Sequence, residues 1–366
     1  MERKLASVRK VDKVLPIEGA DLIEKASIGG WTVVVKKGDF NEGDLAVYFE
    51  IDSFLPNTPE FSFLKDLRTF NGKEGYRLRT VKLRGTVSQG LLLPLKDFAV
   101  LDGIKVEEGN DLTSLLEIVK WEKPVPVQLA GKVKGNFPHF IRKTDEERVQ
   151  NIPLSELEQY KNDWFIETIK IDGSSMTVYV ISEDDVDIDN TPIIKITTGV
   201  CSRNLDLKET DGNSFWEANK KYNITEKLKL YFAKHERAIA LQGELYGEGI
   251  ENNRWNLIGR NFTVFNIWSI SEQKYLSPSQ CIEILDELNS YGIEGEKLQY
   301  VPIVRQGILS EMIEISYDAF LNRADSFYDT KDGKINEGFV YKLDSRIEPA
   351  FSFKAISNEY LLKTKE

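Results

Sequence analysis

The segment Trp121-Glu122-Lys123-Pro124-Val125-Pro126 cannot continue a helix or a central strand, because its prolines lack the backbone N–H group that both elements use. We therefore expect an interdomain linker at residues 121–132. It would separate an N-terminal domain of residues 1–120 from a second domain of residues 133–366. A chain of 366 residues suits about two domains of roughly 100–200 residues each.

The N-terminal domain contains short apolar runs bounded by turn residues, a pattern typical of β-strands. Several strands at this spacing, one of them with a basic face, predict a small β-barrel of the OB type. An SH3-like barrel is the alternative. The expected strands include Trp31–Val35, Leu45–Glu50, Arg77–Leu83 and Gly90–Leu95.

The second domain mixes strand-like and helical patterns without regular alternation, which favours an α+β fold over a doubly wound parallel sheet. Ser277 is the expected N-cap of one helix, and Gly292 follows its end. The expected strands are Trp164–Lys170, Met176–Ile181, Phe262–Ile270 and Gly338–Leu343, and the expected helices are Glu217–His235, Pro278–Tyr291 and Leu309–Arg323.

The net charge of −11 argues against nucleic-acid binding by the chain as a whole, because phosphate contacts need Lys and Arg. One stretch near residues 65–84 is basic against this acidic trend. Its cations could follow a phosphate backbone while Phe70 and Tyr76 stack on bases; a solvated strand face is the alternative. The predicted RNA-binding residues are Arg77, Arg79, Lys82 and Arg84.

The chain resembles an intracellular protein in composition. The charged start is not followed by the apolar segment of a signal peptide, and no run approaches the roughly 20 apolar residues of a membrane helix. Cys201 and Cys281 lie outside any metal-ligand or redox spacing, which is typical of thiols in a reducing compartment. We expect a cytoplasmic protein, or a nuclear one if eukaryotic, without a membrane partner; nothing in the sequence indicates a protein partner.

The segment Thr168-Ile169-Lys170-Ile171-Asp172-Gly173 is the strongest chemical signal. A lysine at a strand end between β-branched apolar residues is an unusual place for a solvated amine. Desolvation or a nearby cation would lower its pKa and so favour the nucleophilic form. Asp172 could orient a ribose hydroxyl or a metal-bound water, and Gly173 would let a nucleotide approach the backbone. Such a short string is by itself a weak signal.

Further motifs follow this lysine in a fixed order, and the series resembles that of the lysine-dependent nucleotidyltransferases. That superfamily comprises ATP-dependent DNA ligases, RNA ligases and mRNA capping enzymes. The resemblance extends over roughly residues 140–360, and the ordered set is more specific than any single motif. The other segments are Ser202-Arg203-Asn204, Gly243-Glu244-Leu245-Tyr246-Gly247, Phe262-Thr263-Val264-Phe265-Asn266-Ile267, Glu337-Gly338-Phe339-Val340-Tyr341-Lys342 and Phe351-Ser352-Phe353-Lys354.

Within this superfamily the RNA ligases are the most similar. Residues 143–151 (KTDEERVQN) resemble the stretch that precedes the lysine in RNA ligases. DNA ligases and capping enzymes place an OB domain after the last motif, whereas only 12 residues follow Lys354 here. An N-terminal OB domain resembles the branch of RNA ligases known from Naegleria and Deinococcus. The implied second domain is a nucleotidyltransferase domain of antiparallel sheets with flanking helices.

The resemblance implies an ATP-dependent RNA ligase that joins RNA 3′-hydroxyl and 5′-phosphate ends, in RNA repair, through AMP linked covalently to Lys170. It implies that Glu244 and Glu337, with Asp172, bind Mg²⁺ or Mn²⁺ through water molecules. It implies that Phe262, in preference to Phe265, stacks on the adenine. The remaining ATP contacts would come from Arg148, Asp172, Gly173, Arg203, Glu244, Lys342 and Lys354.

One residue departs from the family pattern. The last motif usually has two lysines one residue apart, and Ser352 occupies the place of the first. Serine keeps a hydrogen-bond donor but supplies no positive charge, which Lys342 or Arg346 would then provide.

The alternatives to an RNA ligase are a DNA ligase or a capping-type guanylyltransferase with the same lysine, and a nucleic-acid-binding relative without catalytic activity.

Overall fold

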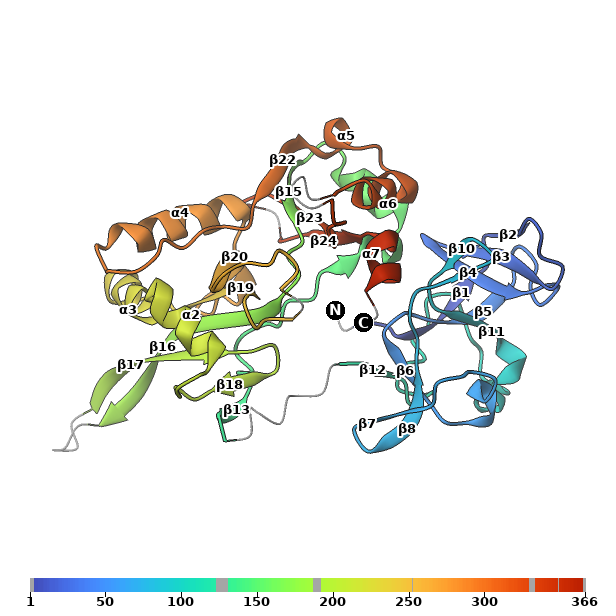
Figure 1. Cartoon of the computed structure of the whole chain (residues 1–366), viewed down its shortest axis with the longest axis horizontal. Helices are drawn as coiled ribbons and strands as arrows, with labels where there is room; N and C mark the ends of the chain where they lie inside the picture. The colour runs from blue at the N-terminus through green and yellow to red at the C-terminus, as the bar shows by residue number, and fades with distance from the viewer. Residues whose placement is uncertain are drawn as a thin grey trace.

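The computed structural model describes residues 3–122, 131–186, 192–251, 253–328, 333–347 and 349–364. Its sheets form two groups: four lie within residues 6–120 and two within residues 133–356, and no ladder joins the groups in the described ranges (Figure 1). This division follows the expected domains, whose exact limits stay a prediction. Residues 123–130 of the expected linker lie outside the described residues.

The N-terminal domain is built from twelve short strands, drawn in blue to teal in Figure 1, and all of its ladders are antiparallel. Their orders are β1-β5-β11, β2-β3-β4, β12-β6-β8-β7 and β9-β10. The bounds are β1 (Ala6–Lys10), β2 (Lys13–Pro16), β3 (Ile23–Ile28), β4 (Trp31–Lys36), β5 (Leu45–Phe49), β6 (Ser53–Pro56), β7 (Arg68–Phe70), β8 (Lys73–Arg77), β9 (Val81–Leu83), β10 (Thr86–Ser88), β11 (Leu91–Pro94) and β12 (Val119–Lys120).

Strand β5 lies between two hydrophobic clusters, because successive side chains of a strand point to opposite faces. Val47 and Phe49 pack in one cluster, whereas Ala46 and Tyr48 pack in the other. Burial on both faces explains why this strand is apolar throughout instead of alternating between polar and apolar residues.

The prediction of one continuous strand at Arg77–Leu83 is wrong. Strand β8 ends at Arg77, and β9 begins at Val81 and pairs with β10 instead of β6. Between them Leu78 turns into the core, where its amide donates to the Ser53 carbonyl oxygen at 2.9 Å. Arg77 therefore ends β8, Arg79 lies between the two strands, Lys82 lies in β9 and Arg84 in the turn after it. These residues do not share one strand face.

The second domain contains a seven-stranded and a five-stranded sheet. Except for the parallel β14–β24 pair, the ladders are antiparallel, and the α+β class expected from the sequence is confirmed. The seven-stranded order is β13 (Val133–Asn136), β18 (Leu205–Leu207), β17 (Pro192–Cys201), β16 (Ser174–Val186), β19 (Ile239–Gly247), β20 (Arg260–Ser269), β21 (Lys274–Tyr275). The five-stranded order is β14 (Glu147–Arg148), β24 (Ser352–Ile356), β23 (Gly338–Leu343), β15 (Trp164–Ile169), β22 (Ile303–Ile308).

Helices flank both sheets (Figure 1). α2, α3 and α4 cover the seven-stranded sheet, and α6 packs on the five-stranded one. None of the helices in the described ranges is long and apolar enough to cross a membrane. The bounds are α1 (Leu154–Leu157), α2 (Ser214–Tyr222), α3 (Ile224–His235), α4 (Pro278–Ser290), α5 (Leu309–Met312), α6 (Tyr317–Asp325) and α7 (Asn358–Lys363).

Local signals explain where these helices begin and end. Ser277 forms a capping box with Gln280 and starts α4 as expected. The helix expected at 217–235 is instead divided into α2 and α3, because Asn223 adopts a left-handed conformation (φ 50°) that ends α2. Likewise the helix expected at 309–323 is divided, and Ser316 caps α6.

Candidate active site

Lys170 is the first residue after strand β15, and residues 170–173 cross from the five-stranded sheet to β16 of the seven-stranded sheet. The Lys170 amide donates to the Gly338 carbonyl oxygen at 2.9 Å, which fixes the crossing to the start of β23. A cavity of about 860 Å³ lies between the sheets and contains Lys170. We call it the nucleotide cavity.

Gly173 allows the two sheets to approach each other beside this lysine. A Cβ atom at Gly173 would lie 2.4 Å from the Leu245 carbonyl oxygen and 3.0 Å from Cγ of Glu244. Any other residue would thus push β16 away from β19 and Glu244. Gly173 also lines the nucleotide cavity, and the approach of a nucleotide to its backbone, expected from the sequence, stays a prediction.

Carboxylates surround the Lys170 amine. Its Nζ lies 2.7 Å from Oε1 of Glu337. Burial acts to lower the pKa of Lys170, but the negative charges of Glu337, Glu244 and Asp172 outweigh it and raise this pKa above its ordinary value. Of the two causes expected to lower the pKa of Lys170, desolvation alone therefore does not produce the neutral amine. The other cause, a neighbouring cation, is needed.

The same cluster has the donor chemistry for a divalent cation. Burial, together with the nearby charges of Glu337 and Asp172, raises the pKa of Glu244 to about 8 although Lys170 opposes the shift. Crowded carboxylates of this kind are stabilised by a hard cation with oxygen ligands. In the described part of the chain no group of three or more Asp, Glu, His or Cys side chains is arranged to hold a metal directly. The binding of a metal through water molecules by Glu244 and Glu337, expected from the sequence, stays a prediction.

The expectation that Phe262 stacks on the adenine is wrong. Phe262 is 2% exposed in the core of the seven-stranded sheet, where its ring faces Gly243, whereas Phe265 lines the nucleotide cavity. Glu244 pairs with Thr263 across β19 and β20, so the cavity face of β20 includes Thr263 and, two residues on, Phe265. The expectation that the two rings lie on opposite faces of the strand is correct, but the ring on the cavity face is Phe265 and not Phe262.

Lys342 lies directly opposite Ser352 in the β23–β24 ladder and lines the nucleotide cavity. Its Nζ is 5.5 Å from the Phe265 ring centroid and 4.0 Å from Oε1 of Glu146, and the Ser352 hydroxyl donates to the same carboxylate. Burial lowers the pKa of Lys342. The charge missing at Ser352 is thus present on its cross-strand neighbour.

Arg346, the other residue considered for that role, forms an ion pair with Glu283 and lines neither described cavity.

A second cavity of about 430 Å³ adjoins the first and is lined by both domains. We call it the interdomain cavity. Lys354 and Arg203 line both cavities. Burial lowers the pKa of Lys354 to about 8, although Asp145 opposes this effect.

Arg148 lines the interdomain cavity and is 6% exposed. Its Nη2 lies 3.7 Å from Asp52, and within the described residues its Nε and Nη1 atoms have no hydrogen-bond partner. A buried guanidinium with unused donors is suited to an anionic ligand such as phosphate. The structure thus separates Arg148 from the nucleotide cavity, with which the sequence associated it.

The predicted RNA-binding residues fall into two sets. Arg77 and Arg79 are half-buried at the interdomain cavity, and Arg77 forms an ion pair with Asp52 at 3.0 Å. Lys82 and Arg84 are exposed on the β9–β10 hairpin. Base stacking by the aromatic residues of this region is excluded, because Phe70 and Tyr76 are 8% and 7% exposed.

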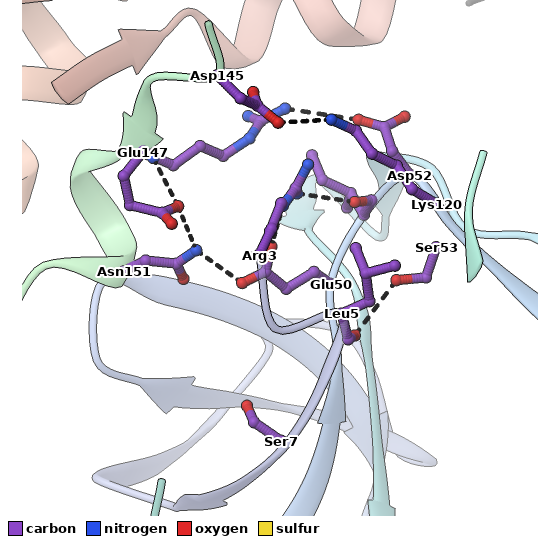
Figure 2. A network of polar contacts seen from close by, with 12 residues as sticks. Arg3, Leu5, Ser7, Glu50, Asp52, Ser53, Lys120, Asp145, Glu147 and Asn151 are labelled. Atoms are coloured by element: carbon purple, nitrogen blue, oxygen red, sulfur yellow. Dashed lines mark hydrogen bonds and ion pairs between the residues drawn. The ribbon is translucent and has the colours of Figure 1, made fainter. Parts of the chain in front are cut away.

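Polar contacts join the two domains beside these cavities, as Figure 2 shows around Asn151. The Trp31 indole donates to the Asn151 side-chain oxygen at 2.6 Å. The Asn151 amide nitrogen donates to Glu50 at 2.6 Å and to Glu147 at 2.8 Å, and Arg3 donates to Glu50 at 2.5 Å (Figure 2). These contacts hold the N-terminal domain beside Lys170.

Sequence reasoning missed four residues of the two cavities. Phe265 was placed on the wrong face, and Asp145 was seen only as part of the 143–151 stretch. Arg3 and Lys120 come from opposite ends of the N-terminal domain and meet only in the fold. No local signal distinguishes the last two from ordinary surface cations.

Comparison with known families gives two matches. A model described as an OB-fold domain matches residues 5–95, and one described as RNA ligase matches residues 163–356. The expected OB module is thereby confirmed. A comparison with curated protein sequences finds no match.

Solved structures of Naegleria gruberi RNA ligase are similar to this chain over nearly its whole length. A variant without ligand has a TM-score of 0.84 and 39% identity over 99% of this chain and 98% of its own. A variant with ATP and Mn has a TM-score of 0.82 and 40% identity over 100% of both chains. A third, with AMP and Mn, has a TM-score of 0.83 and 39% identity over 98% of both chains.

Proposed function

Because the chain belongs to the RNA ligase family, we propose that it joins an RNA 3′-hydroxyl to an RNA 5′-phosphate through AMP linked covalently to Lys170. ATP supplies the AMP, and Mg²⁺ or Mn²⁺ assists the reaction. The physiological role that follows is the repair of RNA breaks. Structures of the Naegleria relative with ATP and Mn support the choice of cosubstrate and metal.

One observation supports this function most directly: the Lys170 amine lies in a cavity large enough for a nucleotide, 2.7 Å from Glu337. Phe265 in the same cavity offers a ring face for the adenine. Lys342 and Lys354 place positive charge where the phosphates would lie. One cavity thus combines a lysine amine, an aromatic ring and further positive charge, and this combination supports the proposal.

In the first step the unprotonated Nζ of Lys170 forms a bond to the α-phosphorus of ATP, while the bond from that phosphorus to the bridging oxygen breaks and pyrophosphate leaves. Catalysis of this displacement rests on positioning and charge neutralisation. A divalent cation held through water by Glu244 and Glu337 would supply positive charge that favours the neutral amine. Lys354 would contact the α-phosphate, and Asp172 would orient a ribose hydroxyl or a metal-bound water.

In the later steps the RNA 5′-phosphate takes the AMP from Lys170, and the 3′-hydroxyl displaces AMP to seal the strand. These steps need an RNA-binding surface. The exposed Lys82 and Arg84 are suited to backbone phosphates, while Arg148 and Arg203 at the interdomain cavity are suited to the terminal phosphate groups.

Self-labelling with α-³²P-ATP and Mg²⁺ or Mn²⁺ tests the first step. Wild type should form an acid-labile, metal-dependent label that Lys170→Ala abolishes and the exposed control Lys161→Ala keeps. Sealing of RNA with 3′-hydroxyl and 5′-phosphate ends tests the rest. A label from GTP instead of ATP would indicate a capping-type enzyme, and no label from a folded wild type would refute the proposal.

A further inference from the structure

Asp145 is an anion surrounded by three cations at the junction of the nucleotide and interdomain cavities. Its carboxylate lies 2.5 Å from Nζ of Lys120, 3.2 Å from Nζ of Lys354 and 3.7 Å from Nη2 of Arg203. Figure 2 shows the Asp145–Lys120 pair spanning the two domains. All four residues line both cavities.

The three cations come from separate parts of the fold. Lys120 ends β12 of the N-terminal domain, Lys354 lies in β24 and Arg203 follows β17. Three cations that converge on one oxyanion from independent segments form the arrangement that binds phosphate groups in proteins. In this structure the oxyanion is a carboxylate that belongs to the chain itself.

The neighbouring cations keep the Asp145 carboxylate negatively charged. Burial acts to raise the pKa of Asp145, but Lys354, Lys120 and Arg203 outweigh it and hold the pKa well below its usual range. A polyphosphate that enters the junction therefore meets cations that are already paired, together with a fixed negative charge.

We infer that Asp145 weakens the binding of pyrophosphate to the enzyme, an inference that rests on the proposed function. Its carboxylate competes with the leaving pyrophosphate for Lys120, Lys354 and Arg203, and thereby favours release after Lys170 has taken up AMP. Weak pyrophosphate binding limits the reverse reaction, in which pyrophosphate attacks the lysyl-AMP phosphorus and regenerates ATP and the free amine.

The charge arithmetic sets the direction of the effect. Asp145→Asn leaves the three cations in place and makes the junction more positive by one unit. In a partly buried site, the Coulomb energy between one unit charge at position 145 and a multiply charged anion is large enough to change the affinity for that anion by about tenfold or more. If Asp145 instead only holds Lys120 and Lys354 in position, its removal should weaken pyrophosphate binding.

The test measures reversal by pyrophosphate. Wild type and Asp145→Asn are labelled with α-³²P-ATP, freed of nucleotide, and mixed with metal and increasing pyrophosphate. We expect half-maximal loss of label at about a tenfold lower pyrophosphate concentration in Asp145→Asn. The control Glu158→Gln removes an exposed negative charge that pairs with Lys161 and lines neither cavity, and it should behave as wild type.

Asp145→Ser removes the same charge and replaces Asp145→Asn if thermal unfolding shows the latter to be misfolded. An unchanged or higher pyrophosphate requirement in the folded variant, with normal labelling of wild type, overturns this inference alone. Failure of wild type to form the label overturns the proposed function and this inference together.

Discussion

Phe262 and Phe265 lie on opposite faces of strand β20: the first packs in the core and the second lines the cavity that contains Lys170. The register of β20 against β19 causes this difference, because Thr263 is the residue opposite Glu244. After Val264 the ladder shifts by one residue, so that Phe265 and Asn266 both lie near Lys342.

The two phenylalanines should therefore respond differently to truncation. Phe262→Ala should destabilise the fold by about 3–5 kcal/mol, as expected for a large buried ring. Phe265→Ala should leave unfolding nearly unchanged and raise the KM for ATP, since base–aromatic stacking contributes about 1–3 kcal/mol. Denaturant unfolding and self-labelling at varied ATP concentration measure these effects. A larger KM effect from Phe262→Ala, at equal stability, would contradict the assignment.

Glu244 should make the metal-free protein less stable as pH rises. Its folded-state pKa of about 8 lies above the ordinary value of 4.5, so between these pH values the folded protein keeps a proton that the unfolded chain has lost. This contribution to stability is complete below pH 4.5 and is lost as pH rises through about 8. Glu244→Gln should accordingly raise the melting temperature of the metal-free protein at pH 9.

Metal binding should show the complementary behaviour. A divalent cation needs the ionised carboxylate, so the rise in melting temperature on adding Mn²⁺ should be greater at pH 9 than at pH 6. Glu244→Gln should reduce this rise, whereas Glu226→Gln on α3, which does not line the cavity, should not. Equal metal stabilisation at both pH values would argue against Glu244 as a metal-binding residue.

Lys342 and Ser352 face each other across β23 and β24 and should contribute unequally to lysyl-AMP formation. Lys342→Ala removes the positive charge beside Phe265 and should slow self-labelling at least about tenfold. Ser352→Ala removes one hydrogen bond to Glu146, which is typically worth about 0.5–1.5 kcal/mol, and should have a small effect. Single-turnover labelling rates measure both. A greater reduction from Ser352→Ala would transfer the main role to the serine.

The exposed cations of the β9–β10 hairpin should affect RNA sealing and not self-labelling. Lys82→Ala and Arg84→Ala should each weaken RNA binding and reduce the slope of log affinity against log salt by about 0.7–0.9 for every phosphate that the variant no longer neutralises. Lys96→Ala, an exposed cation outside the hairpin, serves as the control. An unchanged salt slope in both hairpin variants would place the RNA elsewhere.

Local patterns in the sequence were sufficient for several parts of the fold. The capping residues around Ser277 specified the start of α4, because a helix start depends on neighbouring residues. Strand patterns located β4, β5, β15 and β23 to within a few residues. The helices expected at 217–235 and 309–323 were each interrupted where backbone conformation or packing outweighed periodicity.

By itself, then, the sequence determined the class of the protein and the order of its chemical groups, because a lysine, its flanking carboxylates and the later lysines lie in short contiguous motifs. Only the tertiary structure decided which groups meet. The face of β20 that lines the cavity depends on a cross-strand register, which no single strand encodes. In the cluster of Asp145, Lys120, Arg203 and Lys354, the contact between Asp145 and Lys354 joins residues 209 positions apart. The cluster exists because two sheets and a second domain pack together around one cavity.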